Sequence, residues 1–461
     1  MEHIDICDLK RDYEKYKDGV VTVCGWVRTM RNSKQTCFIE LNDGTALSNV
    51  QIVVDKNTFS DADNIVRQTI GTSLKVEGDL VLTPENKQPF EISARNIEVL
   101  GESPSDYPLQ KKAQTLEFLR TIPHLRVRTN TFNAMFRLRS ELAYGIHDFF
   151  RANNFTYVHT PIITGSDCEG AGEVFNVTAH KYGEKFESEE EFDATDFFRR
   201  KAYLTVSGQL EGETMAMGLG KIYTFGPTFR AENSYTPKHA AEFWMIEPEV
   251  AFADLEDILD LAQRMIKHIT KHCLDKCGDE LVFFRDFYEK GLLDKLDIVA
   301  NSDYAMCEYS EAVELLNKAD KKFEYPVSWG TDLQTEHERY LTEEIFKRPT
   351  FVINYPKDIK AFYMKQNPDG KTVAASDLLV PGIGEIIGGS QREDDYDKLT
   401  SAMTDRGMDL SLYSNYLDLR KYGSVPHAGY GLGFDRMLMY ITGIGNIRDT
   451  IPYPRTTGSM A

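Results

Sequence analysis

The stretch FRAENSYTPKHAAEFWMIEPE, residues 229–249, concentrates charged and aromatic side chains within a short segment. Apolar and aromatic residues at both of its ends predict two strands, and the polar residues between them predict a loop. Arg230 leaves the first strand, and Lys238 and His239 lie in the loop. Together they offer the converging cations that a triphosphate requires.

The same hairpin offers partners for a purine base. Glu232 or Glu242 can accept a hydrogen bond from an amine, and Phe243 can stack on a ring. Charged hairpin tips are also common on protein surfaces without any ligand. Composition alone therefore favours an ordinary hairpin, and the nucleotide site needs further support.

Length and composition describe a large chain of globular type. Its 461 residues exceed what one hydrophobic core usually organises, which predicts two domains. With 41% apolar and 27% charged residues, it has no apolar run as long as a membrane-spanning helix. Residues 1–5 lack the features of a secretory signal, and the seven scattered cysteines fit reduced thiols. We expect a cytoplasmic protein with no membrane contact.

The net charge bears on nucleic-acid binding. A formal charge of −19 argues against non-specific binding, because a phosphate backbone attracts a local excess of Lys and Arg. Arg28, Arg31 and Lys34 nevertheless cluster near the N-terminus. They predict a local positive surface on the first domain.

Residues 20–100 predict a small β-barrel. Turn residues such as Asn42-Asp43-Gly44 separate the strand-like runs, and residues 58–70 are compatible with a helix. This layout matches an OB-type barrel, although other β-barrels and sandwiches share it. We expect Trp26 to be a core residue. The runs are Val20–Val27, Thr36–Leu41, Val50–Val54, Ser73–Gly78 and Phe90–Ala94.

The rest of the chain predicts a second domain of α+β type. Prolines and basic residues between 104 and 128 predict a hinge. Apolar residues at helical spacing predict a helix over 131–153, and a strand over 155–159 follows. The remaining strands and helices lack a βαβ rhythm, which favours an antiparallel sheet flanked by helices. The acidic stretch 187–196 predicts a solvated loop.

Three segments, in this order, resemble the three motifs of class II aminoacyl-tRNA synthetases of the aspartyl/asparaginyl branch. Residues 131–161 are similar to motif 1, which makes the dimer interface and ends in proline. Residues 222–250 are similar to motif 2, the hairpin that holds ATP. Residues 427–445 are similar to motif 3, a glycine-rich strand that delivers an arginine to ATP. Taken alone, GYGLGFDR at 429–436 fits a tightly packed junction between sheet and helix equally well.

The resemblance implies a domain order and an activity. An OB-fold anticodon-binding domain is expected at 1–103, a hinge at 104–128, and a class II catalytic domain at 129–461 with an insertion near 278–348. The expected reaction is ATP-dependent activation of an amino acid to its adenylate, followed by transfer to the 3′ end of a tRNA. ATP and Mg²⁺ are the expected cofactors, and a two-fold symmetric homodimer is the expected assembly.

Carried over from the family, Arg230 and Arg436 are the expected catalytic residues. Arg230 would hold the α-phosphate and the reacting carboxylate, and Arg436 and His239 would hold the distal phosphates. Phe243 would stack on adenine, and Glu232 would accept a hydrogen bond from its amine.

Two acidic residues are implied as a metal site. Asp377 and Glu385 would bind magnesium through oxygen ligands, so that Glu385 also belongs to the ATP site. Lys238 departs from the family pattern, which usually has arginine directly before this histidine. The part that Lys238 plays in phosphate contact stays open.

The resemblance also implies four residues that bind the amino acid. Glu169, in the mobile loop 167–173, and Gln209, in a predicted strand, would contact the α-amino group. Arg392, at the end of the segment 384–392, would donate to the side-chain carbonyl. Glu247 would accept from the side-chain amide.

Asparagine is favoured over aspartate as the substrate. The aspartyl enzymes generally carry a lysine three residues after the glutamine, and Gly212 stands there in this chain. Glu247 would repel a carboxylate but can accept from an amide. The expected partners are therefore L-asparagine and tRNA(Asn). An aspartyl enzyme, a tRNA-independent asparagine synthetase and a non-catalytic OB protein stay as alternatives.

For the barrel, the resemblance implies anticodon recognition. Phe38 would stack on a base, Gln51 would read the central uracil, and Arg28 would belong to the same surface. Such stacking is typically worth ~1–3 kcal/mol per base. From residue type alone, Phe38 could equally be a core residue.

Overall fold

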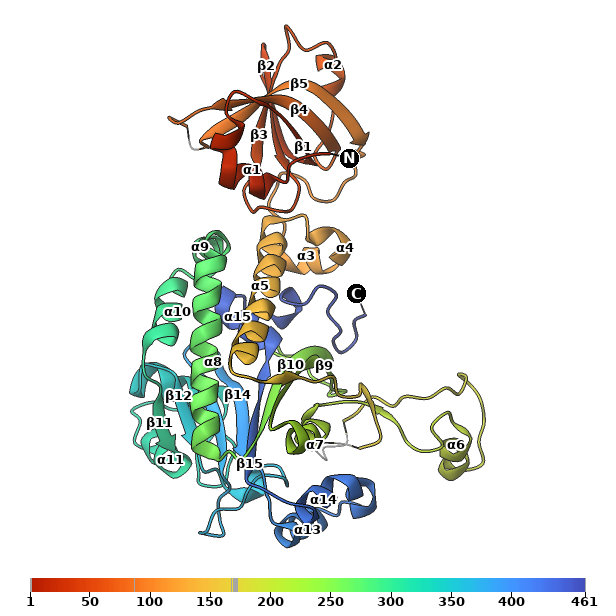
Figure 1. Ribbon diagram of the computed structural model, residues 1–461, viewed down its shortest axis with the longest axis vertical. Helices are drawn as coiled ribbons and strands as arrows, with labels where there is room; N and C mark the ends of the chain where they lie inside the picture. The colour runs from red at the N-terminus through yellow and green to blue at the C-terminus, as the bar shows by residue number, and fades with distance from the viewer. Residues whose placement is uncertain (1, 87, 167, 169–172, 461) are drawn as a thin grey trace. The chain divides into compact units, whose positions relative to one another are not determined.

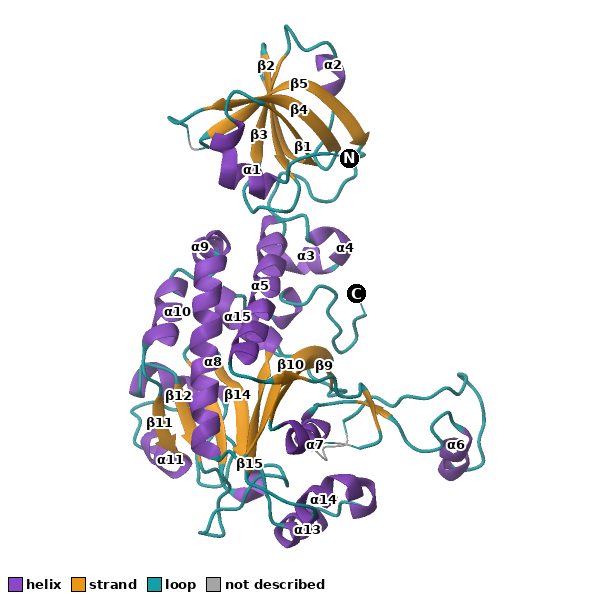
Figure 2. Cartoon of the chain, in the orientation of Figure 1, coloured by secondary structure: helices purple, strands orange, loops and turns teal. Residues whose placement is uncertain are grey.

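The computed structural model describes residues 2–86, 88–166, 168 and 173–460. The chain divides into two compact units, residues 1–136 and 137–461, whose elements are labelled in Figure 1. Figure 2 distinguishes their helices from their strands. Within the part of the chain that is described, no helix has both the length and the apolar character needed to span a bilayer.

The first unit contains a closed five-stranded barrel, in the order β1-β2-β3-β5-β4. All neighbouring pairs are antiparallel except β3 and β5, which run parallel. Each of the five predicted runs forms one of these strands, and the OB-type prediction is confirmed. The strands are β1 (Val20–Asn32), β2 (Thr36–Asn42), β3 (Val50–Asp55), β4 (Ser73–Leu82) and β5 (Phe90–Gly101).

Alternation along β1 decides which of its side chains fill the barrel. Val21, Val23 and Val27 point inward and are buried, whereas Trp26 lies on the other face and is 37% exposed. The guanidinium of Arg128 lies 5.1 Å from the centroid of the Trp26 ring. The prediction that Trp26 is a core residue is therefore wrong, because strand parity outweighs the average preference of tryptophan for the interior.

The segment between barrel and sheet is partly packed. It contains α3 (Leu116–Arg120), which Thr115 caps by accepting from the Phe118 N–H at 3.2 Å. Leu109 and Leu119 are buried against Phe132. The segment therefore has a small apolar core of its own. The other helices of this unit are α1 (Ile6–Asp12), α2 (Ala62–Ile65) and α4 (Pro123–Arg126), and α5 (Asn130–Ala152) begins here.

The second unit is built on an eight-stranded sheet, in the order β11-β12-β13-β14-β15-β10-β9-β6. The central pairs are antiparallel, as predicted, but both edge pairs run parallel, so the sheet is mixed. A separate two-stranded sheet contains β7 (Ile163–Thr164) and β8 (Tyr203–Leu204). The strands of the large sheet are β6 (Thr156–Tyr157), β9 (Lys221–Phe229), β10 (Glu242–Ala251), β11 (Ala305–Glu308), β12 (Thr350–Ile353), β13 (Ala375–Val380), β14 (Gly384–Gln391) and β15 (His427–Gly433).

Helices cover this sheet and position its central strands (Figure 2). The long helix α8 (Leu255–Lys276) starts with a capping box between Asp254 and Asp257 and packs on β13, β14 and β15. The Tyr430 hydroxyl of β15 donates to the Met265 sulfur of α8 at 3.1 Å. The other helices that surround the sheet are α7 (Gln209–Leu219), α9 (Gly278–Phe287), α10 (Leu292–Asn301), α11 (Tyr309–Asn317), α12 (Thr335–Tyr340), α13 (Tyr396–Asp405), α14 (Ser414–Lys421) and α15 (Phe434–Thr442).

Two local predictions need correction. The acidic stretch predicted as a loop contains α6 (Glu189–Thr195), on an arm that extends away from the sheet (Figure 1). Ser188 caps it, and three glutamates in its first turn stabilise its positive N-terminal end. Gln209, predicted in a strand, is the first residue of α7. The backbone there turns into a helix directly after Gly208.

Candidate active site

A cavity of about 350 Å³ lies in the second unit. Strands β10, β13, β14 and β15 and the loop between β9 and β10 contribute its walls. Glu169 lies outside the described residues. The other ten residues predicted for catalysis, ATP, metal and amino acid all line this one cavity: Gln209, Arg230, Glu232, His239, Phe243, Glu247, Asp377, Glu385, Arg392 and Arg436.

Residues 229–249 form the predicted hairpin. Strands β9 and β10 pair antiparallel, with Phe229 opposite Glu242, and the polar residues between them form the loop. The Arg230 backbone N–H donates to the Ala241 carbonyl at 3.0 Å, which closes the loop at its base. The Arg230 guanidinium lies 5.5 Å from the centroid of the Phe243 ring. A cation and a flat aromatic surface therefore face the same part of the cavity.

Lys238 and His239 have different environments within this loop. Lys238 donates to the Ile383 carbonyl at 2.7 Å, and burial, followed by the charge of Arg436, lowers its pKa. His239 lies 3.9 Å from the carboxylate of Glu232, and burial and Arg436 lower its pKa. The ammonium of Lys238 is thus bound to a backbone carbonyl. Among the neighbouring cations, Arg436 lowers the pKa of His239 most.

Asp377 and Glu385 come from neighbouring strands, β13 and β14, and face one another across Gly388. A Cβ added at Gly388 would lie 3.1 Å from Glu385 Oε1 and 3.6 Å from Asp377 Oδ1. Burial, and then the negative charge of Asp377, raises the pKa of Glu385. Two hard oxygen donors that repel one another fit a divalent cation such as Mg²⁺, which would neutralise both.

Two residues beside this acidic pair had no pattern that would have revealed them. Lys360 lines the cavity and donates to Asp377 Oδ2 at 2.7 Å. Glu338, from α12, accepts from the Glu385 N–H at 3.2 Å. Burial, and then the charge of Glu385, raises the pKa of Glu338 to about 8. Asp377 is therefore already paired with a cation of the chain, Lys360. Glu338 adds a third acidic group beside Asp377 and Glu385.

The opposite end of the cavity contains a buried ion pair. Arg392 is 3% exposed and binds Glu249 through two contacts, Nε to Oε2 at 3.2 Å and a terminal nitrogen to Oε1 at 2.5 Å. It also donates to Ser390 Oγ at 2.8 Å. Gly429, opposite Glu249 on β15, leaves the space that this carboxylate occupies. Glu249 was not predicted, although its place two residues after Glu247 puts both on one face of β10.

Three donors fix the carboxylate of Glu247. Ser207 Oγ donates to Oε1, while the Gly208 N–H at 2.9 Å and Thr224 Oγ1 at 3.1 Å donate to Oε2. Gln209 follows directly and donates through Nε2 to Glu213 at 3.0 Å. A carboxylate oxygen can accept two hydrogen bonds, and Oε1 of Glu247 accepts one from Ser207, so it can also accept from a substrate amide.

The predicted anticodon residues lie in the first unit, on the outer face of the barrel. Cys37 and Ile39 are buried while Phe38 between them is half-buried, so Phe38 is not a core residue. Arg31 lies 5.6 Å from its ring centroid. Gln51 is opposite Glu40, hence diagonal to Phe38 on the same face, and donates to Glu91 at 2.9 Å.

Arg28 completes this predicted set from β1. It lies where the β1–β2 register shifts, between Val27 and Thr29, and donates to Asn130 Oδ1 at 2.6 Å. Phe38 and Gln51 therefore share one face of β2 and β3, whereas Arg28 is held by a residue of α5.

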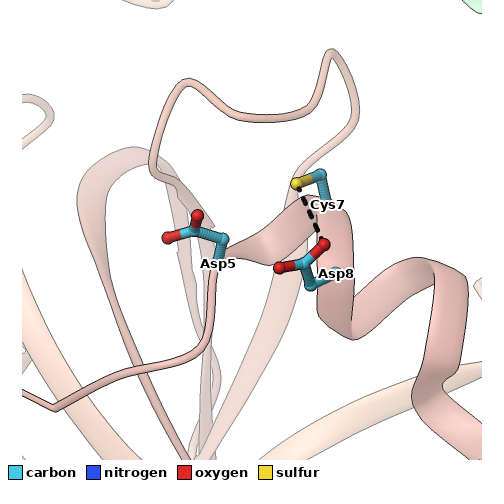
Figure 3. A group of neighbouring side chains, drawn as sticks. All are labelled: Asp5, Cys7 and Asp8. Carbon is cyan, nitrogen blue, oxygen red and sulfur yellow. Dashed lines mark hydrogen bonds between the residues drawn. The ribbon is translucent and has the colours of Figure 1, made fainter.

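A small group of potential metal ligands lies at the start of α1. Figure 3 shows Asp5, Cys7 and Asp8, and the Cys7 sulfur is 3.9 Å from Asp8 Oδ1. Arg11 contacts Asp8 at 2.8 Å, and His3 lies 3.7 Å from Asp5. Arg11 thus already compensates the half-buried carboxylate of Asp8.

Family models match both parts of the chain. The model of class II tRNA synthetases (D, K and N) matches residues 115–457. The model of the OB-fold nucleic acid binding domain matches residues 21–100. The first covers well over half of the chain.

Individual relatives are similar over the full length. The asparagine–tRNA ligase of Acetivibrio thermocellus is 57% identical over 454 residues, 98% of either chain. That of Alkaliphilus oremlandii is 57% identical over 461 residues, covering 100% of this chain and 99% of its own. The crystal structure of the Pyrococcus horikoshii asparaginyl-tRNA synthetase complexed with asparaginyl-adenylate has a TM-score of 0.88, with 33% identity over 99% of both chains. The chain therefore belongs to the class II tRNA synthetases, in the group of the asparagine–tRNA ligases.

Proposed function

We infer that the chain activates L-asparagine with ATP and transfers it to the 3′ end of tRNA(Asn). The observation that carries this conclusion is the composition of one cavity. Arg230 and Arg436 line one part of it, and Arg392 and Glu247 line another. Relatives named asparagine–tRNA ligase, 57% identical over the full length, support the same activity.

The first step joins the amino acid to the α-phosphate. An oxygen of the asparagine carboxylate attacks the α-phosphorus of ATP, the bond to the β-phosphate breaks, and pyrophosphate leaves with the electron pair. Arg230 contacts the α-phosphate and the attacking carboxylate, and so reduces their mutual repulsion. Arg436 and His239 hold the leaving phosphates in line with the attack.

The adenosine part of ATP is bound by the hairpin. Phe243 stacks on adenine, beside the Arg230 guanidinium that lies 5.5 Å from its ring. Glu232 accepts a hydrogen bond from the adenine amine. In the second step, the terminal 3′-hydroxyl of the tRNA attacks the carbonyl carbon of the adenylate, and AMP leaves.

Asp377 and Glu385 are proposed as the magnesium ligands. Their mutual repulsion and oxygen donors support this assignment. Bound magnesium supplies positive charge that neutralises the phosphates. Lys360 donates to Oδ2 of Asp377, whereas Oδ1 is the oxygen that lies near Gly388.

Selection of asparagine is assigned to the buried end of the cavity. Arg392 donates to the side-chain carbonyl, and Glu247 accepts from the side-chain NH2. Gln209 orients the α-amino group, and Glu169 is proposed as its second contact. Glu249 already compensates the charge of Arg392. Arg392 is therefore not an unpaired cation that could bind the side-chain carboxylate of aspartate.

We propose the remaining organisation by analogy with the family. Residues 1–103 bind the anticodon, 104–128 connect the domains, and 129–461 form the catalytic domain. Residues 131–161 resemble the segment that makes the dimer interface, which supports a homodimer. A cytoplasmic location follows from the proposed substrates, ATP and tRNA.

ATP–pyrophosphate exchange by the purified chain tests this function. Asparagine and aspartate are supplied separately, with Mg²⁺ and without tRNA. We expect exchange with asparagine alone, and transfer of labelled asparagine to tRNA(Asn) once the tRNA is added. Exchange with aspartate would identify an aspartyl enzyme, and no exchange by the folded protein with either amino acid would reject the catalytic assignment.

The barrel assignment predicts a selective effect on tRNA. Replacing Phe38 by alanine removes a stacking surface worth ~1–3 kcal/mol, and we expect the KM for tRNA(Asn) to rise about tenfold. ATP–pyrophosphate exchange without tRNA measures the catalytic domain and serves as the control, since it should stay at its wild-type rate. An unchanged KM for tRNA would contradict the stacking role.

A further inference from the structure

A fully buried carboxylate lies behind the amino-acid end of the cavity. Glu213, on α7, accepts four hydrogen bonds: from Gln209 Nε2 at 3.0 Å, the Tyr416 hydroxyl at 3.0 Å, Arg420 at 2.9 Å and His427 Nε2 at 2.9 Å. These donors come from α7 itself, α14 and β15. A single side chain thus connects three elements beneath the cavity.

The carboxylate of Glu213 stays ionised in this environment. Burial alone would raise its pKa, but the charge of Arg420 and the contact with His427 outweigh burial and lower the pKa below its usual range. A buried carboxylate that accepts four hydrogen bonds is a rigid anchor, because water cannot reach it and replace any of the four donors.

Two cavity residues depend on this anchor. Gln209 lines the cavity, and its amide NH2 is held by Glu213, which directs the amide oxygen away from the carboxylate. If the amide were flipped, its oxygen would lie against the Glu213 carboxylate, and two hydrogen-bond acceptors would face one another. Arg392 also lines the cavity, and its Nε lies 3.9 Å from Glu213.

Carboxylates compensate the guanidinium groups at this end of the cavity. Arg392 contacts Glu249 and lies 3.9 Å from Glu213, Arg420 and His427 contact Glu213, and the carboxylate of Glu247 lines the same cavity. A neutral amide enters such a site without penalty, whereas a second carboxylate is repelled. Glu213 contributes one of the charges that make this difference.

We propose that Glu213 is a positioning residue that determines specificity: it fixes the amide of Gln209 for the substrate ammonium and excludes aspartate through its charge. The proposal rests on the proposed activation of asparagine. It assigns to α7 and α14, outside the three motifs, a part in amino-acid selection. Glu213 itself touches no substrate, since it is completely buried.

Glu213→Gln in the full-length chain tests the proposal, because it keeps the shape and removes the charge. We expect the KM for asparagine in ATP–pyrophosphate exchange to rise about tenfold while the KM for ATP stays unchanged. The ratio of kcat/KM for asparagine over aspartate should fall by at least about tenfold, since Arg392 loses one of its two neighbouring negative charges. A merely structural role would leave this ratio unchanged.

Glu280→Gln is the matched control. Glu280 is also buried and paired, with Arg137 at 2.8 Å, but it does not line the cavity. Both variants should lose thermal stability, and only Glu213→Gln should change the KM for asparagine and the selectivity. Identical changes in both, or wild-type values in Glu213→Gln, would overturn the proposal.

Two further measurements keep the result unambiguous. The wild-type chain is assayed first: without asparagine-dependent exchange the proposed function fails, independently of Glu213. If Glu213→Gln does not fold, Tyr416→Phe removes one of the four donors and keeps the charge. A raised KM for asparagine in this variant would support the positioning role, and an unchanged KM would reject it.

Discussion

Replacing Arg230 by alanine is expected to reduce asparagine-dependent ATP–pyrophosphate exchange by about 10³-fold, since one preorganised charge at the reacting centre is typically worth 10²–10³. The loss should fall mainly on kcat, because Arg230 is proposed to stabilise charge that is concentrated in the transition state. Arg230 lies at the base of the hairpin loop, where its backbone is bonded to Ala241. Its position is therefore set by the sheet and survives changes elsewhere in the loop.

Two variants separate charge from geometry at this position. Arg230→Lys keeps a cation but loses the planar fork, and we expect it to recover only about tenfold of the lost activity. Arg285→Ala, which removes an arginine paired with Asp286 outside the cavity, should exchange at the wild-type rate. Exchange by Arg230→Ala within about fivefold of wild type would show that another group holds the α-phosphate.

Much of the fold follows from local patterns. The barrel strands were predictable because period-two alternation and turn residues are both local signals, and β1 to β5 begin where the runs begin. The helix α8 was predictable from Asp254 and the apolar spacing behind it. The motif order predicted the shared cavity, since a family pattern already encodes which distant segments meet.

The errors have local physical causes. Trp26 was assigned by residue type, while its exposure is fixed by whether its position in β1 is odd or even. The acidic stretch around α6 was assigned by charge, but glutamates in a first turn behind a serine cap stabilise a helix. Gln209 was assigned to a strand by resemblance, and the backbone starts α7 there.

Partners across long sequence separations were the part that no local pattern could supply. Arg392 and Glu249 are 143 residues apart, and Arg420 and Glu213 are 207 apart. Such pairs depend on strand order and helix placement, which the sequence determines only through the whole fold. Segment 278–348 illustrates the same limit. Its edge strand β11 and Glu338 have no motif, although Glu338 reaches the acidic pair.

Arg392→Met is expected to have an equally large effect, on both activity and stability. Losing the donor to the substrate carbonyl should lower kcat/KM for asparagine by about 10³-fold or more, as when a buried polar pocket loses its partner. The substitution also leaves Glu249, which is 1% exposed, without its paired cation. Breaking a buried pair from one side costs about 3–5 kcal/mol, so the free energy of unfolding should fall by that amount.

The double variant Arg392→Met with Glu249→Met separates these two effects. Replacing both partners by apolar side chains of similar length removes the stranded charge, and we expect most of the lost stability to return. Activity should not return, because methionine cannot donate to the substrate carbonyl. Urea unfolding and exchange assays on the same preparations measure both quantities. A double variant that recovers exchange along with stability would mean that Arg392 acts by holding Glu249 in place, and that the asparagine side chain is recognised by other donors.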